Sequence, residues 1–155
     1  MARREPFRYA VLLRVRRLQE DQKAFELARV RREIQNAVED REFIAREQAR
    51  MLEEAAAATR EPFDGSRIGR YHQYERHLAR RSVEKDAIIA EKRREEEARR
   101  RELEHATQRK RTVEKLQERD EAFWRSEFQR FEQKLSDETA VNQVANQQAK
   151  RHQSS

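Results

Sequence analysis

Glu102 and His105 form the first pattern in this chain whose residue types and spacing could do chemistry. A Glu-x-x-His motif supplies metal ligands in di-iron helical bundles, where two such motifs and two further carboxylates meet on facing helices. No other histidine of the sequence has a glutamate three residues before it. His72 and His77 are five residues apart, so they do not share a helix face. We therefore predict no metal site.

The carboxylates are abundant, but their abundance does not indicate acid–base catalysis. Such catalysis needs a pocket that moves the pKa values of two groups apart. The 30 acidic residues are spread through a strongly polar sequence, and two glycines cannot build a phosphate-binding loop. Cysteine is absent, which excludes a thiolate metal site and disulfides. We expect no cofactor and no enzymatic activity.

The composition predicts long helices that bury only a narrow stripe. Charged residues make up 43% of the 155 residues and hydrophobic residues 35%, which is too little apolar material for a compact globule. Disorder is disfavoured because there are only two glycines and two prolines, and because strong helix formers dominate. The apolar run from Tyr9 to Leu13 ends at Arg14 and is too short for a signal sequence or membrane span, so we expect a cytoplasmic protein.

One break divides the sequence into two helical segments. Pro62 disfavours helix at Glu61, and Asp64-Gly65 is a turn signal. We predict an all-α fold, a long antiparallel two-helix coiled-coil hairpin in one domain over residues 1–140. Its helices run from about 7 to 59 and from about 67 to 140, joined by a turn over about 60–66. The Asn- and Ser-containing residues 141–155 predict a disordered tail.

Apolar residues at steps of three and four predict the face along which the helices pack. The first helix has two runs that are out of phase, which predicts a shift of the packing face near Phe25. They are Val11, Val15, Leu18 and Phe25, then Leu27, Val30, Ile34, Ala37, Ile44, Met51, Ala55 and Ala58, interrupted by Arg41 and Gln48. The stripe of the second helix is Tyr71, Tyr74, Leu78, Ile88, Ala106, Val113, Leu116 and Phe123.

The middle of the second helix is almost entirely charged. Between Glu91 and Glu102 the only apolar residue is an alanine. Glu95, Glu96 and Glu97 each precede an arginine by four residues, which is the favourable order for pairs on one helix. This pattern predicts a solvated spacer that stays helical with little contact to a partner.

Two surface features exceed the needs of a simple coiled coil. Phe123, Trp124, Phe128 and Phe131 cluster late in the second helix and cannot all face one neighbour. This indicates either contact with another protein or packing against the first helix, which starts at Phe7 and Tyr9. Near the N-terminus, six arginines and one glutamate form a basic patch; the arginines are Arg3, Arg4, Arg8, Arg14, Arg16 and Arg17. This patch suits phosphates or an acidic protein surface, and the mixed charges beyond it favour a protein.

Three sequence blocks resemble the FliJ family of flagellar export proteins. They are Phe7-Arg-Tyr followed by Leu12, Val15 and Leu18; Tyr71-His-Gln-Tyr-Glu-Arg-His-Leu78; and Lys110-Arg-Thr-Val-Glu-Lys-Leu-Gln-Glu-Arg119 with the Gln-Lys-Leu-Ser-Asp-Glu that ends at Glu138. The resemblance covers nearly the whole chain, although residues between these blocks align only by length. It implies an antiparallel coiled coil that resembles the central stalk of rotary ATPases.

The resemblance also implies partners. The family sits in the hexameric ring of the flagellar export ATPase (FliI type), connects it to the membrane export gate (FlhA type) and handles export chaperones. It implies gate-binding residues Tyr71, Tyr74, Leu78, Arg81 and Lys85, and ATPase-ring-binding residues Phe7, Leu116, Arg119, Phe123 and Trp124. The protein would be cytoplasmic and peripheral to the inner membrane at the flagellar base, so it would meet the membrane only indirectly.

Two alternatives remain open from the sequence. One is the YscO-type stalk protein of a virulence type III secretion system, which has the same architecture. The other is a basic coiled coil that binds nucleic acid or ribosomes without sequence preference. Such binding would weaken steeply with salt and would not depend on Tyr74 or Leu78.

Overall fold

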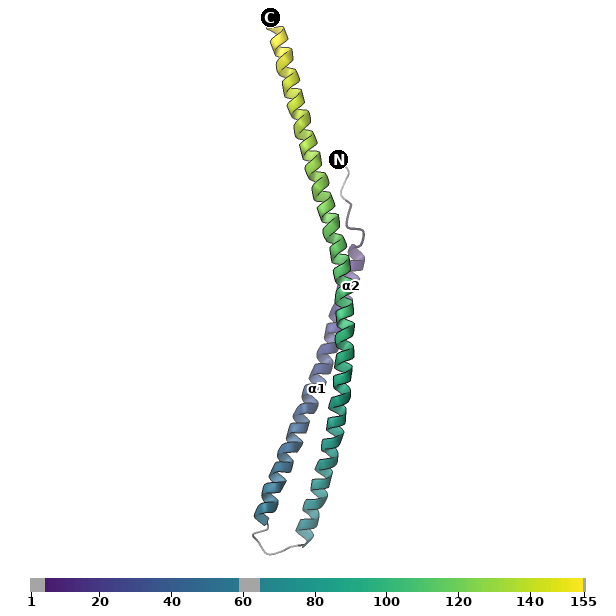
Figure 1. Cartoon of the computed structure of the whole chain (residues 1–155), viewed down its shortest axis with the longest axis vertical. Helices are drawn as coiled ribbons and strands as arrows, with labels where there is room; N and C mark the ends of the chain where they lie inside the picture. Colours follow the sequence, from purple (N-terminus) through teal and green to yellow (C-terminus); the bar gives the residue numbers. More distant parts are fainter. Residues whose placement is uncertain (1–4, 59–64, 155) are drawn as a thin grey trace. The chain divides into compact units, whose positions relative to one another are not determined.

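The computed structural model describes residues 5–58 and 65–154, and nearly all of them are helical. Helix α1 spans Ala10–Ala58 and helix α2 spans Gly65–Gln153 (Figure 1), and the described residues contain no strand. The prediction of an all-α hairpin of two long helices is confirmed. Most of the predicted turn lies at residues 59–64, outside the described residues, while Gly65 and Ser66 already belong to α2.

The start of α1 and the end of α2 differ from the prediction, since α1 begins at Ala10 and not near residue 7, and α2 extends beyond residue 140. Phe7 accepts a hydrogen bond at 3.1 Å from the backbone N–H of Ala10, in a turn that leads into α1. At the other end α2 continues to Gln153, where disorder was expected. Alanines and glutamines support helix between the weaker Asn residues, and three basic residues in the last turn complement the negative end of the helix dipole: Lys150, Arg151 and His152.

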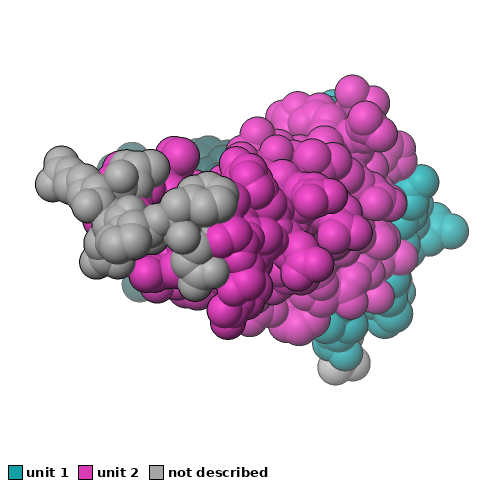
Figure 2. Space-filling view, turned by 90° about the horizontal axis from the view of Figure 1, so that it is seen from below, with its two compact units in different colours: residues 1–18, 107–155 teal, residues 19–106 magenta. Residues whose placement is uncertain are grey.

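Contacts within the chain group into two compact units, coloured in Figure 2. Unit 2 comprises residues 19–106, and unit 1 comprises residues 1–18 and 107–155. Each unit contains one stretch of α1 and one of α2.

Unit 2 buries a single row of side chains on each helix. On α1 the buried residues follow steps of three and seven: Leu27, Val30, Ala37, Ile44 and Met51. On α2 the buried residues are Leu78 and Ser82. Ile44, Met51 and Leu78 form one cluster, against which Tyr71 packs. Residues late in α1 thus meet residues early in α2, as an antiparallel pair requires.

The predicted shift of the packing face near Phe25 is wrong. Val11, Val15, Leu18 and Phe25 are all exposed, and Leu13 is buried in their place at 3% exposure. Leu13 precedes Leu27 by two heptads, so the buried row of α1 keeps one frame. The frame was hidden because Arg16, Glu20 and Lys23 occupy the positions between, half-buried along their aliphatic stems.

The stripe predicted for α2 is correct at half of its positions. Val113 is buried, Tyr71 and Ala106 are half-buried, and Leu78 is buried as above. The other four members are exposed: Tyr74, Ile88, Leu116 and Phe123. In unit 1 the packing face passes through Trp124, one position past the predicted Phe123. Steps of four and three continue this face along α2 through Val113, Gln117, Asp120 and Trp124.

Candidate protein-interaction surfaces

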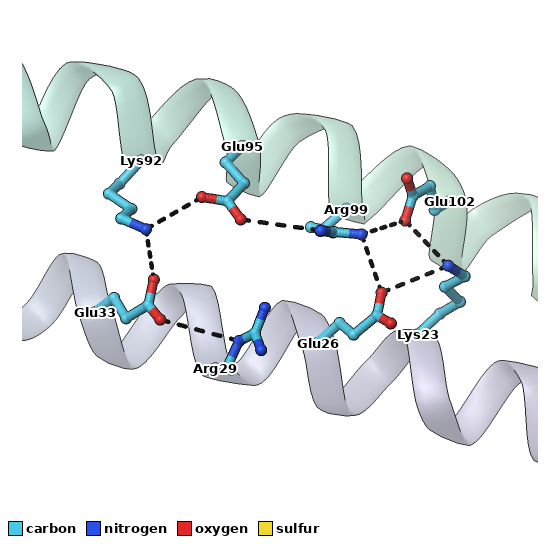
Figure 3. A network of polar contacts seen from close by, with 8 residues as sticks. All are labelled: Lys23, Glu26, Arg29, Glu33, Lys92, Glu95, Arg99 and Glu102. Carbon is cyan, nitrogen blue, oxygen red and sulfur yellow. Dashed lines mark hydrogen bonds and ion pairs between the residues drawn. The ribbon is translucent and has the colours of Figure 1, made fainter.

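The charged middle of α2 is in close contact with α1, which overturns its prediction as a spacer. Lys92 Nζ donates to Glu33 Oε2 at 2.7 Å, and Arg99 Nη1 donates to Glu26 Oε2 at 3.1 Å. Lys23 Nζ reaches Glu102 at 3.4 Å (Figure 3), so Glu102 serves as an ion-pair acceptor. Local pairs contribute as well: Glu97–Arg101 at 3.4 Å and Glu95–Arg99 at 4.0 Å, whereas Glu96 pairs with Arg31 of α1.

The ion pairs between the helices repeat once per heptad. Glu26, Glu33 and Asp40 lie seven residues apart on α1. Their partners on α2, in reverse order, are Arg99, Lys92 and Lys85, also seven apart. Acids therefore line one edge of α1 and bases the matching edge of α2. Because the buried row is narrow, this ladder fixes the relative position of the helices in unit 2.

Hydrogen bonding in this ladder moves the pKa values of its members. The hydrogen bond from Lys92 holds the pKa of the Glu33 carboxyl below its usual 4.5, and the same contact raises the pKa of Lys92. Arg99 lowers the pKa of Glu102 through its hydrogen bond, and Lys23 adds to the effect. Each shift favours the charged form, so these groups are structural ions at neutral pH.

The five residues predicted to bind an export gate fall on two faces of α2 in unit 2. Tyr71, Leu78 and Lys85 lie seven apart on the face toward α1, where Leu78 is 4% exposed and Lys85 Nζ donates to Asp40 at 2.9 Å. Tyr74 and Arg81, also seven apart, are exposed. The Tyr74 hydroxyl donates to Glu47 Oε2 at 3.2 Å. Only Tyr74 and Arg81 of this set therefore present substantial surface to a partner.

A groove of about 320 Å³ lies beside Tyr71 and Leu78, between the end of α1 and the start of α2. Both helices of unit 2 line it. Its walls are Gln48, Met51, Leu52 and Ala55 from α1 and Tyr71, Glu75, Leu78 and Ala79 from α2. Leu52 is 70% exposed at its edge, so the groove offers apolar contact next to Tyr71.

The five residues predicted to bind an ATPase ring all belong to unit 1. Phe123 is 57% exposed and meets Trp124 edge to face, with ring centroids 5.6 Å apart. Leu116 and Arg119 are exposed, and Phe7 contacts Tyr9 edge to face at 5.8 Å. Unit 1 thus displays aromatic surface on both of its chain segments, with Phe7 near basic residues and Phe123 in an acidic stretch.

Several apolar residues of unit 1 are exposed although the sequence analysis named none of them as a binding residue for the ATPase ring or the gate; it had singled out only Phe128 and Phe131, for contact with a protein that it did not identify. On α1 they are Val11, Val15 and Leu18, which were interpreted as packing residues; on α2 they are Phe128, Phe131 and Leu135. Their signal in the sequence is a spacing of four and three that is in a different phase from the buried row.

In the described part of the chain, no three His, Cys, Asp or Glu side chains gather as a candidate metal site. Across residues 5–58 and 65–154, no helix is long and apolar enough to cross a membrane.

Comparison with known proteins identifies the family. A search of curated proteins and a search of solved structures gave no match. The family model of the flagellar FliJ protein matches residues 5–149, which include α1, all but the last four residues of α2, the ion-pair ladder and all the predicted site residues. The chain therefore belongs to the FliJ family and is associated with flagellar protein export.

Proposed function

We propose that this protein is a non-enzymatic, stalk-like component that links the flagellar export ATPase ring to the membrane export gate and handles export chaperones. The family match carries this proposal, because FliJ proteins belong to the flagellar export machinery. The protein acts in the cytoplasm, peripheral to the inner membrane at the flagellar base. It reaches the membrane only through the gate, and it needs no cofactor and no specific nucleic acid.

The gate binds at the start of α2 in unit 2. Tyr74 and Arg81 supply an exposed aromatic ring and an exposed cation on one face, and Tyr74 lines a surface pocket together with Met51 and Tyr71. Tyrosine and arginine are among the residues that most often form binding hot spots. Tyr71, Leu78 and Lys85 act by positioning this face, because they hold α2 against α1.

The ATPase ring binds unit 1. Its exposed Leu116 and Phe123 provide apolar contact, and Arg119 provides charge. The half-buried Trp124 supports Phe123, which it meets edge to face, and Phe7 adds a second aromatic contact with Tyr9 at the start of the chain. Because the gate-binding residues belong to unit 2 and the ring-binding residues to unit 1, one chain offers separate surfaces to the two partners.

The experiment is a bridging assay with purified components. The cytoplasmic domain of the gate protein is immobilised, and retention of the export ATPase is measured with and without this protein. We expect retention only when the protein is present. Tyr74→Ala with Arg81→Glu abolishes binding to the gate but preserves binding to the ATPase, and Phe123→Ser does the reverse. Val83→Ser is the matched control, since Val83 is 69% exposed on α2 of unit 2. If Val83→Ser weakened gate binding as much as Tyr74→Ala with Arg81→Glu does, the assignment of the gate-binding face would be contradicted.

A further inference from the structure

The end of α2 carries an apolar row with no partner within the described chain. Every residue from 128 to 154 is exposed. Phe128 is 47% exposed, Phe131 38% and Leu135 53%. With the half-buried Trp124 they follow steps of four, three and four. This is the spacing of a coiled-coil packing face, and such a face is not stable alone in water. We call it the α2 row.

The start of α1 carries a second row with the same spacing. Val11, Val15 and Leu18 follow steps of four and three and are exposed by 71%, 41% and 62%. They lie on the side of α1 away from the buried Leu13. We call them the α1 row. Both rows belong to unit 1, where each is left open to solvent.

The two rows match each other in register. When Val11 is level with Trp124, Val15 is level with Phe128 and Leu18 with Phe131. Helices that run parallel with equal spacing interdigitate in this way. Val15 and Phe128 then share one heptad position, and Leu18 and Phe131 share the other.

Charge complements this match. The start of α1 is basic, with Arg8, Arg14, Arg16 and Arg17 against Glu5. Residues 120–138 of α2 are acidic, with six acids against three bases: Asp120, Glu121, Glu127, Glu132, Asp137 and Glu138 against Arg125, Arg130 and Lys134. In the parallel register Arg14 flanks the α1 row at the position that faces Glu132 across the seam.

Pairing of α2 with another α2 fits less well. In a parallel pair of two α2 rows, Glu127 of one copy would face Glu132 of the other, and like charges at these positions oppose association.

We propose that two copies of this chain associate through these rows, with the α2 row of each copy packed in parallel on the α1 row of the other. The contact is reciprocal, so it closes as a symmetric dimer and does not grow into a filament. It covers Trp124 and lies beside Phe123, both assigned above to the ATPase ring. The dimer is a resting form that must open before unit 1 can enter a ring. Self-association does not depend on the proposed function.

The first test is the mass of the full-length protein, measured by sedimentation equilibrium over a wide concentration range. We expect a reversible transition from one chain of 18.8 kDa to two. Phe128→Ser with Phe131→Ser weakens the dimer by about a hundredfold or more, because it removes the largest side chains of the α2 row. Phe43→Ser is the matched control, since Phe43 is a 57% exposed aromatic residue of unit 2. It leaves dimerisation unchanged.

Charge exchange distinguishes the two modes of pairing. Arg14→Glu alone and Glu132→Arg alone each weaken the dimer, by about three- to tenfold for two symmetric contacts. The double variant restores it, because the pair is rebuilt with reversed signs. Tighter association of Glu132→Arg alone would overturn the proposal in favour of α2–α2 pairing.

Cysteine cross-linking tests the register directly, because the chain has no cysteine of its own. A mixture of Val15→Cys and Phe128→Cys proteins forms an intermolecular disulfide between unlike chains, since level positions of paired helices lie within reach of an S–S bond. Links only between like chains, or a protein that stays monomeric at every concentration, would overturn the proposal. A dimer that Phe128→Ser with Phe131→Ser leaves equally tight would also overturn the proposal.

Discussion

The Nη1 atom of Arg99 donates a hydrogen bond to Oε2 of Glu26 at 3.1 Å, joining residues that are 73 positions apart in the chain. One heptad along, Lys92 meets Glu33 in the same way, and one further heptad along, Lys85 meets Asp40. This ladder sets the alignment of the two helices of unit 2. It therefore positions Tyr74 and Arg81, the exposed residues of the proposed gate-binding face.

Charge reversal tests the ladder. Glu33→Lys places two cations opposite each other at Lys92 and lowers the melting temperature. Lys92→Glu alone places two anions there and does the same. The double reversal, Glu33→Lys with Lys92→Glu, recovers most of the loss. Thermal unfolding followed by circular dichroism at low and high salt measures this. Additive losses in the double variant would show that the pair does not contribute to alignment.

Acid weakens the helix pair. The carboxyls of Glu33, Glu47, Glu97 and Glu102 have folded-state pKa values below 4.5, each lowered mainly by a hydrogen bond from a cation. Their contribution to stability is complete above 4.5 and is lost as the pH falls through the folded-state values. The melting temperature is therefore flat near neutral pH and falls below about pH 4.5. Glu33→Gln reduces the fall, and an undiminished fall in that variant would exclude Glu33 as a contributor.

The apolar cluster of unit 2 supplies stability that the charges do not. Ile44 and Leu78 are 2% and 4% exposed in one cluster. Truncation of either residue to alanine lowers the free energy of unfolding by about 2–4 kcal/mol. Phe43→Ala changes it by less than about 0.5 kcal/mol, because Phe43 faces solvent beside Ile44. Chemical denaturation gives both values. An equal loss at Phe43 would contradict the orientation of α1.

The frame of α1 in unit 1 is testable in the same way. Leu13→Ala lowers the free energy of unfolding by about 2–3 kcal/mol, because Leu13 is 3% exposed. Val11→Ala has almost no effect on the unfolding of one chain, since its side chain is 71% exposed. Measurements at low protein concentration keep self-association out of the result. The opposite ranking would restore the alternative frame through Val11, Val15 and Leu18.

The sequence predicted the two helices because strong helix formers surround a single turn signal. It predicted the buried row from Leu27 to Met51 because apolar residues recur there at heptad spacing despite the polar Arg41 and Gln48. It failed where charged side chains occupy half-buried positions between the helices. Lys23, Lys92 and Arg99 lie in the contact region between the helices, and each is paired with an acid of the opposite helix. Hydrophobic periodicity does not reveal such positions, because their partners are distant in sequence.

The proposed sites show the same limit. The motif match on the Tyr71 to Lys85 block assigned all five residues to one binding site, whereas burial separates Leu78, which packs against α1, from the exposed Tyr74. Trp124 was placed outside the packing face because the stripe was traced through apolar residues alone. In the structure Gln117 and Asp120 continue that face between Val113 and Trp124. Three-dimensional contacts were needed to separate the residues that hold the helices together from those left open to partners.

The most direct test of the central claim is affinity co-purification of the tagged, full-length protein from its own cells at physiological salt, after nuclease treatment. Bound proteins are identified by mass spectrometry. The account predicts recovery of a hexameric export ATPase and an export-gate protein, with the gate protein lost from the variant that combines Tyr74→Ala and Arg81→Glu. Recovery of ribosomal or nucleoid proteins that disappear after nuclease treatment, with neither export protein present, would contradict it.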